Sequence, residues 1–103
     1  MQIIETSGFT RRVSTLLRDE EYRALQMMLV ENSEAGRLIV GTGGARKVRW
    51  AQAGRGKTGG VRVIYYYATS EGVILMLTVY AKSEQDALTD AQKKALRAII
   101  EAG

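Results

Sequence analysis

The strongest guide to the fold of this chain is a pair of β-rich runs that are separated by only four residues. The runs extend from Val61 to Ala68 and from Val73 to Lys82, and both are rich in Val, Ile, Tyr and Thr. A connection as short as Thr69 to Gly72 favours antiparallel pairing of the two runs. A third run of the same kind, Ala45 to Ala51, precedes them, so we expect a three-stranded antiparallel meander.

Apolar residues at helical spacing flank the meander on both sides. On the N-terminal side they predict two consecutive helices, Thr10 to Leu17 and Glu20 to Asn32, with Asp19 as the N-cap of the second. We expect the apolar faces of these helices to be buried in the chain's own core, with a partner surface as the alternative: Phe9, Val13, Leu25 and Met28. On the C-terminal side, Thr89 and Gln92 have the spacing of a capping box and precede a helical apolar face of Ala95, Leu96, Ile99 and Ile100.

The expected order of elements is an edge strand, two helices, the meander and a final helix. The edge strand is the apolar start, Met1 to Glu5, whereas Leu38 to Val40 is too short to assign. Gly41 to Gly44 is a glycine turn that accommodates positive φ angles. A chain of 103 residues is large enough for one hydrophobic core, so we expect a single α+β domain over residues 1–103.

Composition removes several classes of chemistry. The chain has no Cys and no His, which excludes zinc sites, thiol nucleophiles and Ser-His-Asp triads. Any catalysis must therefore come from Lys, Arg, Tyr, Asp, Glu, Ser or Thr. The sequence contains neither a signal peptide pattern nor an apolar run long enough to span a membrane, so we expect a cytoplasmic protein without a membrane partner.

Charge is distributed unevenly along the chain, although the net charge is only +4. All 11 acidic residues lie outside the segment Ala35 to Ser70, which contains seven of the 15 basic residues: Arg37, Arg46, Lys47, Arg49, Arg55, Lys57 and Arg62. A cationic middle third between mildly acidic ends indicates a polyanionic partner for that third.

Part of this segment, AQAGRGKT from Ala51 to Thr58, loosely matches a phosphate loop. A working phosphate loop is followed by a helix whose first amides surround the phosphates. Here Gly59 and Gly60 follow, and then the strand-like VRVIYYY. Nucleotide hydrolysis is therefore not predicted, and the bland alternative for this stretch is a hairpin tip kept soluble by its charges.

Alternation of side chains along the strands gathers many of the cations on one face of the meander. We expect one face to pack under the helices and the other to display a basic patch to solvent: Lys47, Arg49, Arg62, Tyr80 and Lys82. Arginine binds phosphate bidentately, and proteins bind single-stranded RNA through both cations and stacked aromatic rings. Core packing or contact with a protein partner is favoured for each of four aromatic residues, and among them Tyr66 is the best candidate for stacking on a base: Trp50, Tyr65, Tyr66 and Tyr67.

Four stretches carry a resemblance to a known family: GTGGARKVRW, GRGKTGGVRVIYYY, LTVYAKSEQDAL and DEEYRALQMMLVENSEAGRLI. Through them the sequence resembles the RelE/HigB superfamily of type II toxins, close to its HigB-like branch, over about residues 9–101. The resemblance implies a RelE-like α+β fold, in which two N-terminal helices and a C-terminal helix pack around a small antiparallel sheet. It also implies a ribosome-dependent endoribonuclease that enters the A site and cuts translated messenger RNA. A cognate antitoxin, expected to be of helix-turn-helix type, would silence it.

The chemistry that the resemblance implies is attack of a ribose 2′-hydroxyl on the adjacent phosphate, without a metal or cofactor. Such a reaction needs a base, positive charge around the phosphorane and an acid for the leaving 5′-oxygen. By position, the cations of RelE-like enzymes fall on Lys47, Arg49, Arg62 and Lys82. Arg62 and Arg49 are assigned to phosphate stabilisation. Lys47 is the expected base, and Lys82 or Tyr80 is the expected acid. Further RNA contacts are expected from Arg46, Arg55, Lys57 and Tyr66.

The sequence departs from the family pattern at its C-terminal end. RelE carries a catalytic Tyr there and some HigB toxins a His, whereas this chain has no Tyr after Tyr80 and no His. Two other functions stay open. One is a ParE-like toxin of the same fold, which inhibits DNA gyrase by binding; the other is a non-catalytic module that binds the ribosome or RNA. The cations on the sheet favour an RNA target.

Overall fold

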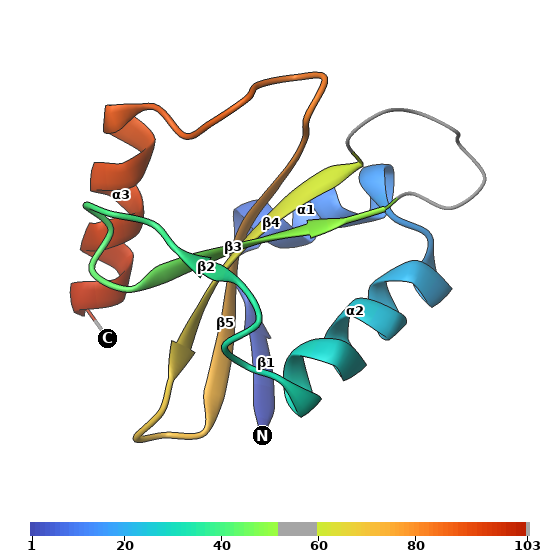
Figure 1. Ribbon diagram of the computed structural model, residues 1–103, viewed down its shortest axis with the longest axis horizontal. Helices are drawn as coiled ribbons and strands as arrows, with labels where there is room; N and C mark the ends of the chain where they lie inside the picture. Colours follow the sequence, from blue (N-terminus) through green and yellow to red (C-terminus); the bar gives the residue numbers. More distant parts are fainter. Residues whose placement is uncertain (52–59, 103) are drawn as a thin grey trace.

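The computed structural model describes residues 1–51 and 60–102 (Figure 1). Its elements follow the chain in the order β1 (Gln2–Glu5), α1 (Ser7–Leu16), α2 (Asp19–Glu31), β2 (Arg37–Leu38), β3 (Ala45–Trp50), β4 (Val61–Ala68), β5 (Val73–Ala81) and α3 (Asp90–Ala102). Two residues expected to bind RNA, Arg55 and Lys57, lie outside the described residues, as does most of the stretch that resembles a phosphate loop.

The strands of the described chain form one mixed sheet with the order β1-β5-β4-β3-β2. The predicted antiparallel meander is confirmed in β3, β4 and β5. The predicted edge strand is also confirmed: β1 pairs in parallel with β5, which the long connection between the two strands permits. The opposite edge is β2, a strand of two residues that pairs antiparallel with β3, in a region too short to assign from sequence.

At the starts of α2 and α3, side chains accept hydrogen bonds from backbone amides that lack a partner within the helix. At α3 the predicted box is confirmed, because the backbone N–H of Gln92 donates to Thr89 Oγ1 at 3.1 Å and the N–H of Thr89 donates to Gln92 Oε1 at 2.9 Å. At α2 the prediction of Asp19 as the N-cap is wrong. Arg18 takes that position, and its backbone N–H donates to Glu21 Oε1 at 2.7 Å. Asp19 is instead the first residue of the helix, where its charge suits the helix dipole.

The first face of the sheet packs against α1 and α2. The core on this side contains Phe9, Val13, Leu17, Leu25, Leu29, Val61, Val63, Tyr65, Ile74, Met76 and Val79. The helical residues expected in the core all lie there, with Met28 partly buried against the cluster. Trp50 on β3 packs against the same cluster, and its indole N–H donates to the carbonyl oxygen of Glu21 at 3.1 Å. This hydrogen bond ties β3 to α2.

The second face carries a smaller core under α3, which is made of Ala45, Ile64, Leu77, Tyr80 and Leu96. Figure 1 shows α3 well apart from α1 and α2, at the left of the view. The prediction that this face is open to solvent is therefore wrong for Arg62 and Tyr80, which are 7% and 3% exposed. Alternation along the strands does not reveal a helix that docks on the second face. Lys47, Arg49 and Lys82 are exposed or partly exposed.

Candidate nucleic-acid interface

A cationic cleft of about 450 Å³ lies between β2, β3, β4 and the connection from β5 to α3. Its walls contain four cations and one acid, and the lining residues are Ala35, Arg37, Lys47, Val48, Arg49, Arg62 and Asp86. Three residues that the sequence assigned to the reaction, Lys47, Arg49 and Arg62, are therefore brought together in one concave surface. We refer to this surface as the cationic cleft.

Strand register explains how the cations converge. Arg37 on β2 lies opposite Lys47 on β3, and Arg49 on β3 lies opposite Arg62 on β4. Like charges directly opposite each other on neighbouring strands destabilise a sheet. The arrangement is thus unfavourable for folding alone and suits a surface that receives an anion. Arg37 belongs to the basic segment but could not be assigned to the site from the sequence, because a strand of two residues gives no period-2 signal.

Arg62 differs from the other cleft cations in its burial. It is 7% exposed and lies opposite Tyr80 of β5, under the edge of the core that α3 covers. A guanidinium stays protonated even when it is buried, whereas an ammonium in such surroundings loses its proton more readily. Partial exclusion of water also strengthens the interaction of a cation with a bound anion. Arg62 is therefore suited to stabilising negative charge on a phosphate in the cleft.

Tyr80, an expected proton donor, is placed differently from the cleft cations. It does not line the cationic cleft but a smaller cavity of about 190 Å³ between β5 and α3, together with Gln85 and Gln92. Its hydroxyl is buried and has no hydrogen-bond partner within the described part of the chain. Burial raises the pKa of the Tyr80 hydroxyl, and the nearby charge of Arg62 offsets part of that rise. The phenol is thus kept protonated, at a site separate from the cleft lining.

Lys82, the other expected proton donor, lies at the rim of the cleft. Its ammonium group is 3.6 Å from Asp86 Oδ1, and Asp86 itself lines the cleft. Both side chains are exposed, so this ion pair is weak and can exchange with an incoming phosphate. Asp86 was not predicted as a site residue, because an acid in a solvated loop gives no distinctive sequence signal.

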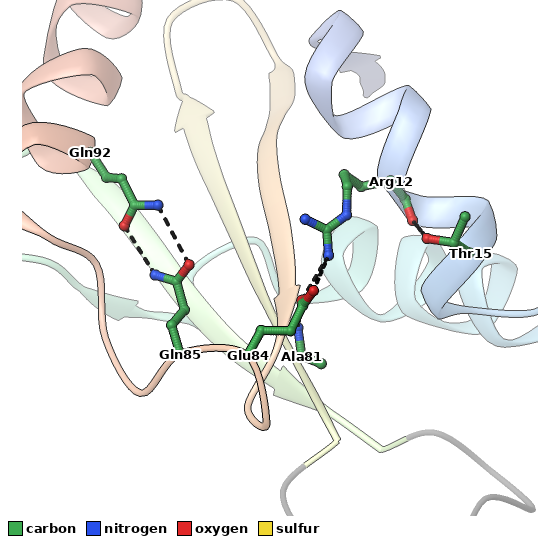
Figure 2. A network of polar contacts seen from close by, with 6 residues as sticks. All are labelled: Arg12, Thr15, Ala81, Glu84, Gln85 and Gln92. Carbon is green, nitrogen blue, oxygen red and sulfur yellow. Dashed lines mark hydrogen bonds and ion pairs between the residues drawn. The ribbon is translucent and has the colours of Figure 1, made fainter.

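The loop that carries Lys82 and Asp86 is fastened to two helices (Figure 2). Arg12 of α1 donates through Nη2 to both carboxylate oxygens of Glu84, at 2.7 and 2.9 Å, and the same carboxylate accepts the backbone N–H of Ala81 at 2.9 Å. On the other side, Gln85 Nε2 donates to Gln92 Oε1 of α3 at 3.0 Å. The Ala81 amide, followed by Arg12, lowers the pKa of Glu84 below its ordinary value.

Two further residues expected to contact RNA lie outside the cleft lining. The guanidinium of Arg46 donates through Nη1 to the carbonyl oxygens of Glu34 and Gly36, at 3.2 and 2.8 Å, so it fixes the backbone before β2. Tyr66 is partly buried and packs against the core under α3. The structure thus gives both residues packing or backbone partners and does not bring them to the cleft.

Residues 1–51 and 60–102 contain neither a membrane-spanning helix nor a metal-binding cluster. None of the helices in the described part of the chain is long and apolar enough to cross a bilayer. No group of three or more His, Cys, Asp or Glu side chains that would hold a metal ion occurs in these residues either.

Comparisons with known proteins identify the family and the fold of this chain. A family model described as the RelE toxin of the RelE / RelB toxin-antitoxin system matches residues 1–102. Among solved structures, the chain is similar to one chain of the intact RelBE toxin-antitoxin complex of E. coli, with a TM-score of 0.56 and 16% identity, covering 78% of this chain and 94% of that one. It is also similar to a mutant of the E. coli toxin RelE in the free state, with a TM-score of 0.59 and 14% identity, covering 97% and 95%.

These structural likenesses establish the fold, and they confirm the predicted RelE-like α+β architecture. The narrower placement in a HigB-like branch stays a prediction. Because the family model spans nearly the whole sequence, this chain belongs to the RelE toxin family of toxin-antitoxin systems.

Proposed function

We propose that the protein is a ribosome-dependent endoribonuclease that enters the A site and cuts translated messenger RNA. The observation that carries this proposal is the cationic cleft, in which Arg37, Lys47, Arg49 and Arg62 face one concave surface of about 450 Å³. A surface of this charge fits the sugar-phosphate backbone of RNA. Membership of the RelE toxin family supports the same activity.

In the proposed reaction, the 2′-oxygen of a ribose attacks the adjacent phosphorus while the bond from phosphorus to the 5′-oxygen breaks. The products are a 2′,3′-cyclic phosphate and a 5′-hydroxyl. Negative charge builds up on the phosphorane, and the guanidinium groups of Arg62 and Arg49 stabilise it there. The uncharged form of Lys47, which also lines the cleft, takes the proton of the 2′-hydroxyl. Lys82 at the rim returns a proton to the leaving 5′-oxygen, a role for which it is better placed than the buried Tyr80.

A cognate antitoxin is the expected protein partner, as the family name and the RelBE complex indicate. We propose an antitoxin of helix-turn-helix type, which neutralises the toxin in the cytoplasm. An adjacent reading frame that encodes such a protein, and that abolishes growth arrest when co-expressed, tests this part of the proposal.

Loss of Arg62 is the sharpest test of the nuclease activity. We expect Arg62→Ala to lower cleavage of translated messages about 100-fold or more, as removal of one group that stabilises transition-state charge does elsewhere. Primer extension on messages from cells that express the toxin without antitoxin measures this loss. Because Arg62 is buried, Arg49→Ala serves as an exposed second variant, and Arg11→Ala on α1 is a control that keeps full activity.

The outcomes separate the alternative functions. Intact messages in cells arrested by the wild-type protein would contradict the nuclease. If DNA supercoiling by gyrase is inhibited in the same cells, the protein is instead a ParE-like inhibitor of DNA gyrase. Ribosome binding without cut messages, weakened by Arg62→Ala in a salt-dependent way, would identify a non-catalytic ribosome-binding module.

A further inference from the structure

A second cationic hollow lies beside the cationic cleft, between the turn that precedes β3 and the first half of α3. Its volume is about 800 Å³, and it is lined by Val40, Gly41, Asp90, Ala91, Lys93, Lys94 and Arg97. Three cations and one acid therefore face this surface. We refer to it as the turn–α3 hollow; none of the residues assigned to the reaction lines it.

The turn that forms one wall is fixed by its own hydrogen bonds. Thr42 is fully buried, and its hydroxyl donates to the carbonyl oxygen of Ile39 at 2.7 Å and accepts the backbone N–H of Ala45 at 3.0 Å. Gly41 and Gly43 take φ angles of 89° and 80°, which side chains other than glycine rarely adopt. A wall of backbone with few side chains leaves the hollow open and accessible.

The turn also supports the cations on the opposite wall. A Cβ atom built on Gly41 would lie 4.0 Å from Lys93 Cδ, and one on Gly43 would lie 3.6 Å from Arg97 Cγ. The aliphatic stems of both cations thus run beside the turn, which reduces the side-chain entropy that is lost when their charged ends bind. Arg97 donates to Glu101 Oε2 at 2.9 Å in an exposed pair, which an incoming phosphate can exchange.

The hollow adjoins the cleft, because the same two segments line both. Arg37 in the cleft is three residues before Val40 in the hollow, and Asp86 in the cleft is four residues before Asp90 in the hollow. The turn continues directly into β3, which carries Lys47. Lys47 is the third residue of β3, so the cleft begins within a few residues of the turn.

We propose that the turn–α3 hollow is a second RNA-backbone subsite, which binds phosphates of the nucleotides that flank the cleaved position. The inference rests on the proposed function, because it extends the path of the RNA in the cleft. A polyanion of continuous charge matches two neighbouring cationic surfaces, because three cations and one acid line the hollow and four cations and one acid line the cleft. The subsite contributes affinity for longer RNA and takes no part in the reaction.

The test compares short and long RNA that cannot be cut. Fluorescence anisotropy measures binding of 2′-O-methyl oligonucleotides of three and ten residues in buffers of 50 to 200 mM salt. For the double variant Lys93→Ala/Lys94→Ala we expect about tenfold weaker binding of the long oligonucleotide, with binding of the short one unchanged within about twofold. The salt slope for the long oligonucleotide falls by about 1 to 2, because each phosphate contact on a single strand contributes about 0.7. The control Arg11→Ala/Arg23→Ala removes two exposed helical cations elsewhere and leaves binding of both oligonucleotides intact.

Several results would overturn the subsite. They are unchanged binding of the long oligonucleotide by the double variant, an equal loss for both lengths, an equal loss in the control, or no binding of the long oligonucleotide by the wild-type protein at 50 mM salt. Loss of antitoxin binding with RNA binding intact would make the hollow a protein interface and would also contradict the proposal. Because these oligonucleotides cannot be cut, the dependence of binding on oligonucleotide length tests the subsite independently of whether the protein is a nuclease.

Discussion

Tyr65 connects the hydrophobic core to the backbone that precedes the cleft cation Arg37. It is fully buried on β4, where its hydroxyl donates to the carbonyl oxygen of Ser33 at 2.8 Å and accepts the backbone N–H of Gly36 at 2.9 Å. Burial raises the pKa of this hydroxyl. Gly36 immediately precedes Arg37, so these hydrogen bonds fix the backbone just before a cleft cation.

We expect Tyr65→Phe to lower the free energy of unfolding by about 1 to 3 kcal/mol, because it leaves the buried amide of Gly36 without its acceptor. Thermal or urea unfolding measures the loss. Message cleavage at a temperature where the variant is folded falls only slightly, since these hydrogen bonds fix the backbone before Arg37, which takes no part in the proposed reaction. Tyr67→Phe, on a partly buried ring of the same strand, is the matched control and has a smaller effect. A folded Tyr65→Phe variant that cannot cut RNA would contradict the structural role.

Gly36 is constrained by contact rather than by backbone conformation. A Cβ atom at this position would lie 2.8 Å from Tyr65 Cε1 and 3.0 Å from Arg46 Cβ, so one of these neighbours must move. We expect Gly36→Ala to cost about 1 to 3 kcal/mol of unfolding free energy, as overpacking does in other cores. Chemical denaturation checks this value, with Gly8→Ala in α1, where a Cβ has space, as the control. Equal stability of the two variants would show that the cluster around Tyr65 adapts without cost.

Residue patterns in the sequence revealed which side chains share a face, but not how far each face is covered. Alternation in VRVIYYY correctly separated Tyr65, which packs in the core with α1 and α2, from Arg62 and Tyr66. It gave no indication that Tyr80 packs with Leu96 of α3 or that Arg62 is only 7% exposed. Burial on that face depends on contacts with a helix distant in sequence, and such contacts leave no local signal.

The loop between β5 and α3 is the element on which the proton donor of the proposed reaction depends. Arg12 and Ala81 converge on Glu84, while Gln92 fastens the neighbouring Gln85 to α3 (Figure 2). These contacts set the path of the chain between Lys82 at its start and Asp86 in the cleft. Glu84 is therefore a positioning residue for Lys82.

We expect Glu84→Gln to lower the rate of message cleavage several-fold while ribosome binding changes little, because the loop carrying Lys82 loses its fixed path. Single-turnover cleavage on programmed ribosomes separates the rate from binding. The stability effect is below about 1 kcal/mol, since the ion pair is exposed and screened by solvent. Glu101→Gln removes a comparable carboxylate from an exposed pair on α3 and leaves the rate unchanged. Equal cleavage rates for Glu84→Gln and Glu101→Gln would contradict the role of Glu84 in positioning Lys82.

The lowered pKa of Glu84 also predicts how the effect of Glu84→Gln on stability depends on pH. Because the folded protein lowers the pKa of this carboxyl, its stabilisation is complete above the ordinary pKa of a glutamate and is lost as pH falls through the lowered value. The difference in unfolding free energy between wild type and Glu84→Gln is thus present at pH 7 and disappears in acid. A difference that does not change with pH would mean that the charge of Glu84 is irrelevant.

Elements of the fold were predictable where local chemistry specifies them. The β4–β5 hairpin and the α3 capping box follow from a short turn and from the spacing of Thr89 and Gln92. The pairing of β4 and β5 contains a register shift, from Ile64 opposite Thr78 to Tyr65 opposite Met76, and a strict period of 2 does not predict it. The two residues of β2 are a strand through their pairing with β3, which local sequence does not specify.

On the scale of the whole molecule, folding brings four of the seven cations of the middle segment into one cleft. All acids lie outside residues 35–70, and within the described chain only Asp86 adds a carboxylate to the cleft lining. The four cleft cations repel one another once the sheet has formed, and they are far less concentrated in the unfolded chain. A polyanion that binds the folded state therefore stabilises it through mass action.

We accordingly expect an RNA that cannot be cut to raise the melting temperature of the protein. At about 100 times its Kd, a ligand that binds only the folded state adds about 2.7 kcal/mol. In a domain of this size, 1 kcal/mol corresponds to about 4 to 8 °C. The expected rise is thus on the order of 10 °C at low salt, and it shrinks as added salt screens the cleft. Differential scanning fluorimetry with a 2′-O-methyl oligonucleotide measures it. The variant Lys47→Ala/Arg49→Ala should show a much smaller rise, and a shift equal to that of wild type would place the RNA somewhere other than the cleft.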